Sequence, residues 1–226
     1  MNNIGTLNES HLHASLKEWY REAGDLVEVP KNGFVIDLIR DGLLIEIQTR
    51  GFSAMRKKFD HLLDLYTIRI VHPIAIKKWI TKLDNEGNET SRRRSPKSGI
   101  AADVCAELVS FPSLLSHPNF TLDVVLIEED EVRRFDAKKG RRRGGYVIEE
   151  RRLVDVIETV QIYSPKDLLR FLPPELPEIF TTKDLAKGLG RTRHLAREVG
   201  YCLRVSGAVN TMGRDKRGIL YKNPKS

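Results

Sequence analysis

The chain has 226 residues, of which 40% are hydrophobic and 31% charged, and its formal net charge of +7 gives a pI of about 9.4. This length allows one large or two small domains. The positive charge favours a polyanionic partner such as nucleic acid, although ribosomal or membrane-surface proteins carry a similar charge. The two cysteines are far apart and indicate neither a disulfide framework nor a zinc site. No signal peptide or membrane span is visible, so we expect a cytoplasmic protein that does not enter a membrane.

The first predicted element is a helix over residues 8–23. Its apolar positions recur with helical period and comprise Leu12, Leu16, Trp19 and Tyr20. Glu9 lies on the same face one turn earlier, so it is either a solvated residue at the helix end or a functional carboxylate that reaches inward. We place His13 near the predicted site and His11 in solvent, although a purely structural role is the simpler interpretation of both histidines.

The next predicted elements are three short β-rich runs, at residues 26–30, 33–39 and 43–48. Asp41-Gly42 lies between the last two runs, and Asp-Gly is a strong signal for a two-residue hairpin turn. In that register Asp37 lies directly opposite Glu46, with the two Cβ atoms roughly 5 Å apart. Two carboxylates this close repel each other, and a bound divalent cation would offset the repulsion. A solvated strand face is the alternative, but the apolar neighbours of both acids argue against it.

A second helix is predicted at residues 53–66, followed by strands at 67–73 and 77–83. The order of helix, three strands, helix and strand, with Asp on the second strand and Glu-Ile-Gln on the third, resembles the PD-(D/E)XK nuclease superfamily. That superfamily includes Holliday-junction resolvases and Mrr-type restriction enzymes. The resemblance covers roughly residues 5–82 and implies an α/β fold built on a mixed α+β sheet. The Glu-Ile-Gln-Thr string also resembles an uncharacterised group of bacterial proteins.

The resemblance implies a metal-dependent active site with Mg²⁺ or Mn²⁺ as the cofactor. Its catalytic residues would be Glu9, Asp37, Glu46 and Gln48. The metal ligands would be Asp37, Glu46, the backbone carbonyl of Ile47, and Glu9. Gln48 stands where the family usually has lysine, and its amide can orient a water molecule but carries no charge. Lys57, Lys58 or Arg50 could supply the missing cation.

Two basic segments lie outside this motif. Residues 91–99 show no periodicity, so we predict a flexible loop there, with a phosphate-contacting loop as the functional alternative. Residues 137–145 form the predicted tip of a hairpin between long strands at 120–134 and 146–163. The predicted DNA contacts in the two segments are Arg92, Arg93, Arg94, Lys97, Arg141, Arg142 and Arg143.

The last part of the chain has a different pattern. A short helix at 165–171 precedes a capped helix at 183–188, a glycine-rich turn, a second helix at about 192–205 and two short strands around a basic tip. This order resembles a winged helix-turn-helix over roughly residues 164–223, in which the second helix enters the major groove. The predicted DNA contacts are Arg191, Arg193, His194, Arg197, Arg214, Lys216 and Arg217. A protein-interaction or dimerisation module is the alternative.

We therefore predict a nuclease-like domain over residues 1–163 and a winged-helix domain over residues 164–226. The predicted function is that of a metal-dependent endonuclease that hydrolyses phosphodiester bonds in duplex or branched DNA. The alternative is a non-cleaving DNA-binding regulator or structural module with a degenerate nuclease fold. No P-loop, Gly-x-Gly-x-x-Gly motif or zinc spacing supports another enzyme class. Two cuts across a duplex usually need two active sites, so a homodimer is expected by analogy.

Overall fold

The computed structural model describes residues 10–136, 138 and 144–224 of a mixed α+β protein. The predicted site residues Glu9, Arg141, Arg142 and Arg143 lie outside the described residues. The chain divides into two compact units. The first unit comprises Met1–Thr49, Ile70–Ile100 and Val124–Val160, and the second comprises Arg50–Arg69, Ala101–Asp123 and Gln161–Ser226. The predicted boundary at residue 164 stays a prediction.

The first unit begins with helix α1 (His11–Tyr20), which is capped by the Ser10 side chain accepting from the His13 amide at 3.3 Å. A three-stranded meander follows, made of β1 (Leu26–Lys31), β2 (Phe34–Arg40) and β3 (Leu43–Ile47). Both of its turns have two residues with positive φ, namely Asn32 (47°) with Gly33 (81°) and Asp41 (46°) with Gly42 (86°). These values define type I′ turns, which match the twist of the paired strands.

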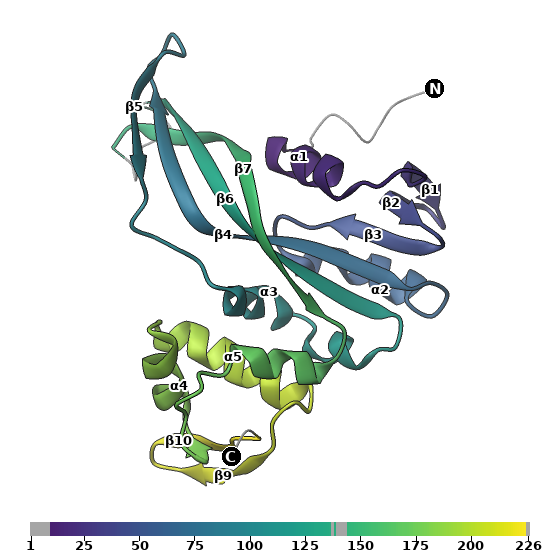
Figure 1. Cartoon of the computed structure of the whole chain (residues 1–226), viewed down its shortest axis with the longest axis vertical. Coiled ribbons are helices and arrows are strands. Elements are labelled where there is room, and N and C mark those ends of the chain that lie inside the picture. Colours follow the sequence, from purple (N-terminus) through teal and green to yellow (C-terminus); the bar gives the residue numbers. More distant parts are fainter. Residues whose placement is uncertain (1–9, 137, 139–143, 225–226) are drawn as a thin grey trace. The chain divides into compact units, whose positions relative to one another are not determined.

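Three of the remaining strands of the sheet are much longer, namely β4 (Ile68–Leu83), β6 (Phe120–Phe135) and β7 (Tyr146–Ile162). The fourth, β5 (Glu89–Arg94), is short. The seven-stranded sheet has the order β1-β2-β3-β4-β6-β7, and β5 pairs with β4 (Figure 1). The loop predicted at residues 91–99 was therefore wrong for its first half, because β4 supplies a pairing partner for β5. The two strands predicted at 67–73 and 77–83 form one continuous strand, β4.

The core of the first unit lies between α1 and one face of the sheet. It comprises Leu12, Leu16, Leu38, Ile45, Ile47, Val71, Val125 and Ile127. Burying each of these side chains stabilises the fold by roughly 1.5–3 kcal/mol. The two leucines sit four residues apart on one face of α1, as the helical period predicted. This packing fixes α1 over the strands that carry Asp37 and Glu46.

The second unit contains short helical elements from three parts of the chain. They are η1 (Phe52–Met55), α2 (Arg56–Leu62), η2 (Ala101–Val104), α3 (Cys105–Leu108), η3 (Pro112–Ser116) and η5 (Pro165–Phe171). Phe59 of α2 contacts Phe111 and Phe120 edge-on, with both centroid distances at 5.7 Å. These aromatic contacts join segments that are distant in the sequence.

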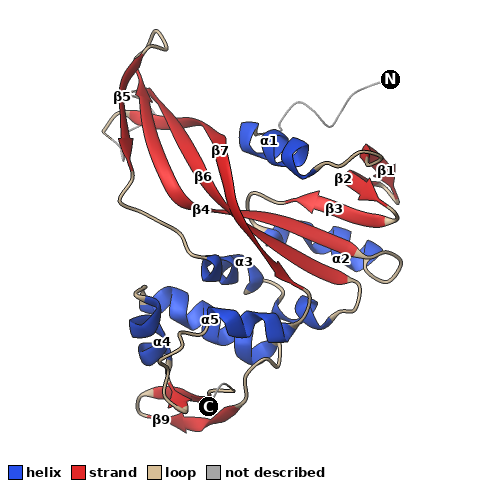
Figure 2. Ribbon diagram, viewed as in Figure 1, coloured by secondary structure: helices blue, strands red, loops and turns tan. Residues whose placement is uncertain are grey.

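The C-terminal elements of this unit are two helices and a small sheet (Figure 2). They are β8 (Ile179–Phe180), α4 (Thr182–Leu189), α5 (Arg193–Val205), β9 (Thr211–Asp215) and β10 (Gly218–Lys222), and the sheet has the order β8-β10-β9. Thr181 and Asp184 form the capping box at the start of α4, and Gly190 ends that helix with φ 61°. The predicted helix, turn, helix and hairpin are therefore present, whereas β8 was not predicted.

Helix α5 buries one face against α3. Its buried residues are Leu195, Ala196, Val199, Gly200, Cys202 and Leu203. The Cys202 thiol lies 3.6 Å from the Cys105 carbonyl and donates to it. Removing the C-terminal elements would expose α3, so substitutions on the surface of α5 are better tests of its role than truncation.

Candidate functional site

The register that the turn predicts for β2 and β3 is confirmed where the two strands pair. Arg40 pairs with Leu43, Ile39 with Leu44 and Leu38 with Ile45. Asp37 and Glu46 are the next residues along the two strands, and their direct pairing stays a prediction. Glu46 is only 5% exposed. Both acidic residues lie in a largely apolar part of the sheet.

The carboxylate of Asp37 is held by groups from two elements. Its Oδ2 accepts from the Ile47 amide at 2.8 Å and lies 3.2 Å from His13 Nε2. Lys17, one turn after His13 on α1, pairs with Glu28 at 2.7 Å. Burial alone would raise the pKa of Asp37, but the hydrogen bond and charge of His13, the Ile47 amide and the charge of Lys17 together lower that pKa below its usual value.

Because of these contacts, a bound metal ion is no longer the only group that could offset the charges of Asp37 and Glu46. The sequence indicated two carboxylates in need of a cation, and the structure supplies basic side chains from α1. The placement of His13 near Asp37 agrees with the sequence analysis, and His11 is exposed as expected. The role of Lys17 was missed. Its spacing of four residues from His13, on one face of a helix, is the signal that could have found it.

The lowered pKa of Asp37 gives a prediction for stability against pH. An acid with a lowered folded-state pKa stabilises the fold fully above its unfolded pKa of about 3.9, and this contribution is lost as the pH falls through the folded pKa. Asp37→Asn should therefore lose less free energy of unfolding than the wild type between about pH 5 and about pH 3. Urea denaturation at both pH values measures the difference. Asp41→Asn, on the exposed turn, is the control and should behave like the wild type.

Gln48 comes directly after β3 and is fixed through its backbone. Its amide donates to the Val71 carbonyl at 2.9 Å, and its carbonyl accepts from His72 Nδ1 at 2.6 Å. His72 is 5% exposed. The contact fixes the histidine with its proton on Nδ1, facing Gln48. His72 was not predicted as a site residue, although a histidine that interrupts an apolar strand was a usable signal.

The described residues do not by themselves form a complete magnesium site. Within the described ranges, no group of three or more His, Cys, Asp or Glu side chains is placed to hold a metal. One oxygen of Asp37 already has the Ile47 amide and His13 as neighbours. Of the proposed ligands, Glu9 lies outside the described residues. Lys57, Lys58 and Arg50, considered as substitutes for the family lysine, belong to the second unit.

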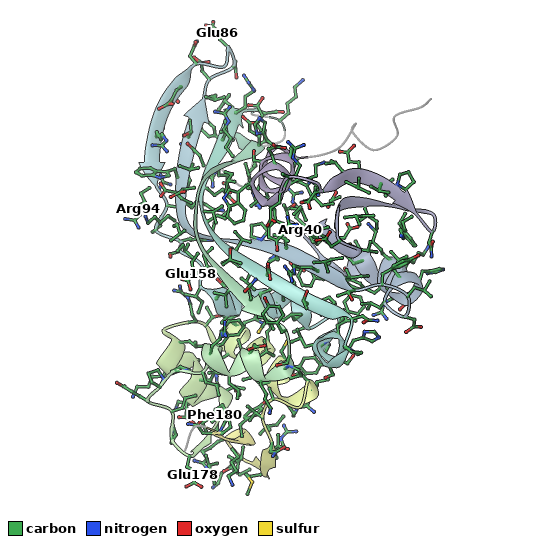
Figure 3. All side chains as sticks on the ribbon, turned by 45° about the vertical axis from the view of Figure 1, so that its right-hand side comes forward. Arg40, Glu86, Arg94, Glu158, Glu178 and Phe180 are labelled. Atoms are coloured by element: carbon green, nitrogen blue, oxygen red, sulfur yellow. The ribbon has the colours of Figure 1, made fainter. Side chains whose placement is uncertain are left out.

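A basic groove of about 580 Å³ lies in the first unit beside β4 and β5. Its lining residues are Ile76, Lys77, Lys78, Arg93, Arg94, Ser95, Pro96, Lys97 and Ser98. Lys77 and Lys78 are paired with glutamates of β6 at 3.6 Å and 3.0 Å. Figure 3 shows Arg94 projecting outward from β5. Within the described part of the chain, no carboxylate pairs with Arg93, Arg94 or Lys97, so their charge is available to an anionic ligand.

Arg92 is less available than its neighbours. Its Nε donates to Asp130 at 2.9 Å, and its guanidinium lies 4.3 Å from the centroid of the Trp79 ring. Trp79 in turn donates to Glu128 at 2.6 Å. Of the four DNA contacts predicted in this segment, the structure therefore gives Arg92 a structural partner and leaves the other three facing the groove or solvent.

A second basic surface lies on the solvent-facing side of α5. Arg193, Arg197 and Arg204 are exposed, and their spacing places them on one side of the helix with Tyr201 between the last two. His194 is exposed but lies 3.2 Å from Glu198, one turn later. Arg191 precedes the helix and is partly buried. The exposed arginines are the residues on this helix that could meet a phosphate.

The hairpin after α5 extends the same basic character. Arg214 and Lys216 are exposed at the β9–β10 turn, and no carboxylate among the described residues pairs with either. Arg217 is different, because its guanidinium binds Asp215 at 2.7 Å. That contact lowers the pKa of Asp215 and raises the pKa of Arg217. Two of the three predicted tip residues are thus free for phosphate contacts.

Comparisons with known proteins show a family without showing an activity. Residues 10–163 match a family described as "Domain of unknown function (DUF8091)". A protein of Treponema pallidum (strain Nichols) described as "Uncharacterized protein" is 32% identical over 221 residues, which is 97% of this chain and 87% of that protein. No solved structure matches the chain. In the described residues, no helix combines the length and apolar character needed to cross a membrane. The family match and the identity over nearly the whole chain show that this protein belongs to the DUF8091 family.

Proposed function

We propose that this protein binds duplex DNA through α5 and the β9–β10 hairpin. One observation carries the proposal: two capped helices joined by a tight turn are followed by a basic hairpin, in a sheet of order β8-β10-β9. This is the order of elements in a winged helix-turn-helix, where the second helix enters the major groove and the hairpin touches the backbone. Arg193 and Arg197, at the start of α5, are the residues we expect to meet guanine edges.

The distribution of charge supports the same proposal. The unpaired cations of the α5 face, the hairpin tip and the groove in the first unit account for much of the excess charge of +7. Lysine and arginine contacts to phosphates supply affinity without sequence preference, whereas arginine contacts to base edges supply specificity. The groove around Arg94 would add phosphate contacts, which supply affinity without sequence preference.

A salt titration tests the proposal. Each cation that neutralises a phosphate releases counterions, so the logarithm of the affinity falls linearly with the logarithm of the salt concentration. Replacing Arg214 and Lys216 together with alanine should weaken duplex binding and flatten that slope by roughly one unit for each lost contact. Arg217→Ala should change the slope less, because Asp215 already neutralises that side chain. Fluorescence anisotropy on the full chain provides the measurement.

The matched control removes the same number of charges elsewhere in the second unit. Lys166 and Arg170 are exposed on η5, which precedes the helix-turn-helix in the sequence, and their double alanine variant should keep the slope of the wild type. If the hairpin variant and this control have the same slope, the C-terminal elements do not contact DNA. The alternative of a protein-docking or dimerisation module would then replace the proposal.

A metal-dependent endonuclease is the second candidate function. The observation that favours it is the pairing of β2 with β3, in which Asp37 and Glu46 are the next residues after the Leu38–Ile45 pair and Gln48 comes directly after β3. The αβββαβ order at the start of the chain agrees with the nuclease resemblance. In this proposal Mg²⁺ or Mn²⁺ would be the cofactor, duplex or branched DNA the substrate, and a homodimer the form that cuts both strands. It stands second because the described residues supply an incomplete set of metal ligands.

A further inference from the structure

A pocket of about 320 Å³ lies between α5 and β10 in the second unit. Its lining residues are Thr182, Arg197, Tyr201, Arg204, Ile219 and Tyr221. This volume is at the lower end of the range of small-molecule sites, roughly 300–1,000 Å³. The pocket therefore has room for one small molecule or for one unit of a polymer.

The base of the pocket is rigid and aromatic. The Tyr221 ring is 2% exposed and stacks on Phe180, with centroids 5.3 Å apart and an interplanar angle of 19°. Its hydroxyl stands only 3.0 Å from the position that a Cβ on Gly200 would occupy, so a glycine there lets α5 approach the ring. Burial raises the pKa of Tyr221, so its hydroxyl stays protonated and able to donate. Tyr221 thus closes the base of the pocket with a nearly buried aromatic ring.

The open side of the pocket combines an aromatic ring with two cations. Tyr201 is 39% exposed, and Arg197 and Arg204 lie about one turn to either side of it on α5. The Arg204 guanidinium stands 5.5 Å from the centroid of the Tyr201 ring. Among the residues that the structure describes, no carboxylate pairs with either arginine, and the lining includes no acidic residue. Such a site suits a planar molecule that carries negative charge.

We propose that this pocket takes one unpaired nucleotide of a bound DNA strand. The base would lie against Tyr201 and Ile219, and its phosphate would bind Arg204. A base inside a duplex has both faces covered by its neighbours, so only an unpaired base can stack on an aromatic side chain. The inference rests on the proposed DNA binding and deepens it, because it names DNA with an unpaired nucleotide as the preferred ligand over a fully paired duplex.

A comparison of two labelled DNAs tests the inference on the full chain. One is a fully paired duplex, and the other is the same duplex with a single extra unpaired nucleotide. We expect the bulged duplex to bind roughly tenfold more tightly, which is a typical effect of one base stacked on an aromatic side chain. With 2-aminopurine as the unpaired base, binding should also quench its fluorescence through stacking on Tyr201.

Variants of Tyr201 separate stacking from general binding. Tyr201→Ala should remove the preference for the bulged duplex and the quenching, whereas Tyr201→Phe should keep both. Tyr163→Ala, at another exposed tyrosine of the second unit, is the control and should behave like the wild type. Equal affinity for the two DNAs in the wild type, or a preference that survives Tyr201→Ala, would overturn the inference and leave duplex binding in place. Binding to neither DNA would overturn the proposed function as well.

Discussion

Replacing Arg40 with alanine should lower the free energy of unfolding by about 3 kcal/mol. The Arg40 guanidinium binds both carboxylate oxygens of Asp25, at 2.9 Å and 2.8 Å. It also donates to Glu22 at 2.5 Å and to the Tyr20 carbonyl at 2.7 Å. The Asp25 side chain is 2% exposed, so removal of the arginine leaves a buried charge without its main partner. The substitution also removes the hydrogen bond that links the end of β2 to the end of α1.

The pKa of Asp25 supports this expectation, because the hydrogen bond from Arg40 is the main cause that lowers it. Urea denaturation at neutral pH measures the change. Arg94→Ala is the matched control, since Arg94 is exposed and has no carboxylate partner among the described residues, and its free energy of unfolding should match that of the wild type. A loss below about 1 kcal/mol for Arg40→Ala would mean that the network behaves as an ordinary surface ion pair.

Replacing Asp37 or Glu46 with alanine decides the second candidate function. If the pair holds a catalytic metal, wild-type protein should nick plasmid DNA in Mg²⁺ or Mn²⁺ and stop on addition of EDTA. Each alanine variant should then lose at least about a hundredfold in rate, because loss of even an outer-shell partner of a metal site costs 10–100-fold. DNA affinity should be nearly unchanged, since both residues lie in the first unit and α5 in the second.

Asp41→Asn provides the control for cleavage. This position lies on the turn between the same two strands, is exposed, and has the positive φ that asparagine tolerates. The variant should cut at the wild-type rate. Wild-type protein that binds DNA but cuts none of the duplex, branched or single-stranded substrates in either metal would exclude the endonuclease and leave DNA binding as the proposed function.

Local sequence signals account for the parts of the structure that were predicted well. Asp41-Gly42 specified a two-residue turn, and the turn alone fixes the pairing of Arg40 with Leu43 and of Leu38 with Ile45. The capping box of Thr181 and Asp184 likewise marked the start of α4. In each case the residues that set the geometry lie within a few positions of one another.

Features that depend on distant residues were not predicted. Strand β5 has no alternation of apolar and polar residues, and it forms because Arg92 and Arg94 pair with residues of β4. The contact of His13 with Asp37 depends on how α1 packs across the strands. A sequence without an alignment of relatives does not report such pairings, because the energy that selects them comes from tertiary packing rather than from local propensity.

The edge strands of the seven-stranded sheet, β1 and β7, carry features that oppose aggregation. An unpaired strand edge is a template for the backbone of another chain, and long flat edges promote aggregation. Strand β1 carries Pro30, which lacks an N–H group to offer to an incoming strand. Strand β7 has exposed charged residues at every third position, so both of its faces carry them, namely Glu149, Arg152, Asp155 and Glu158. A second chain that docked along the 17 residues of β7 would have to place its side chains beside these charged groups and remove them from water. This cost opposes the addition of strands to the β7 edge, and with it fibrillar assembly.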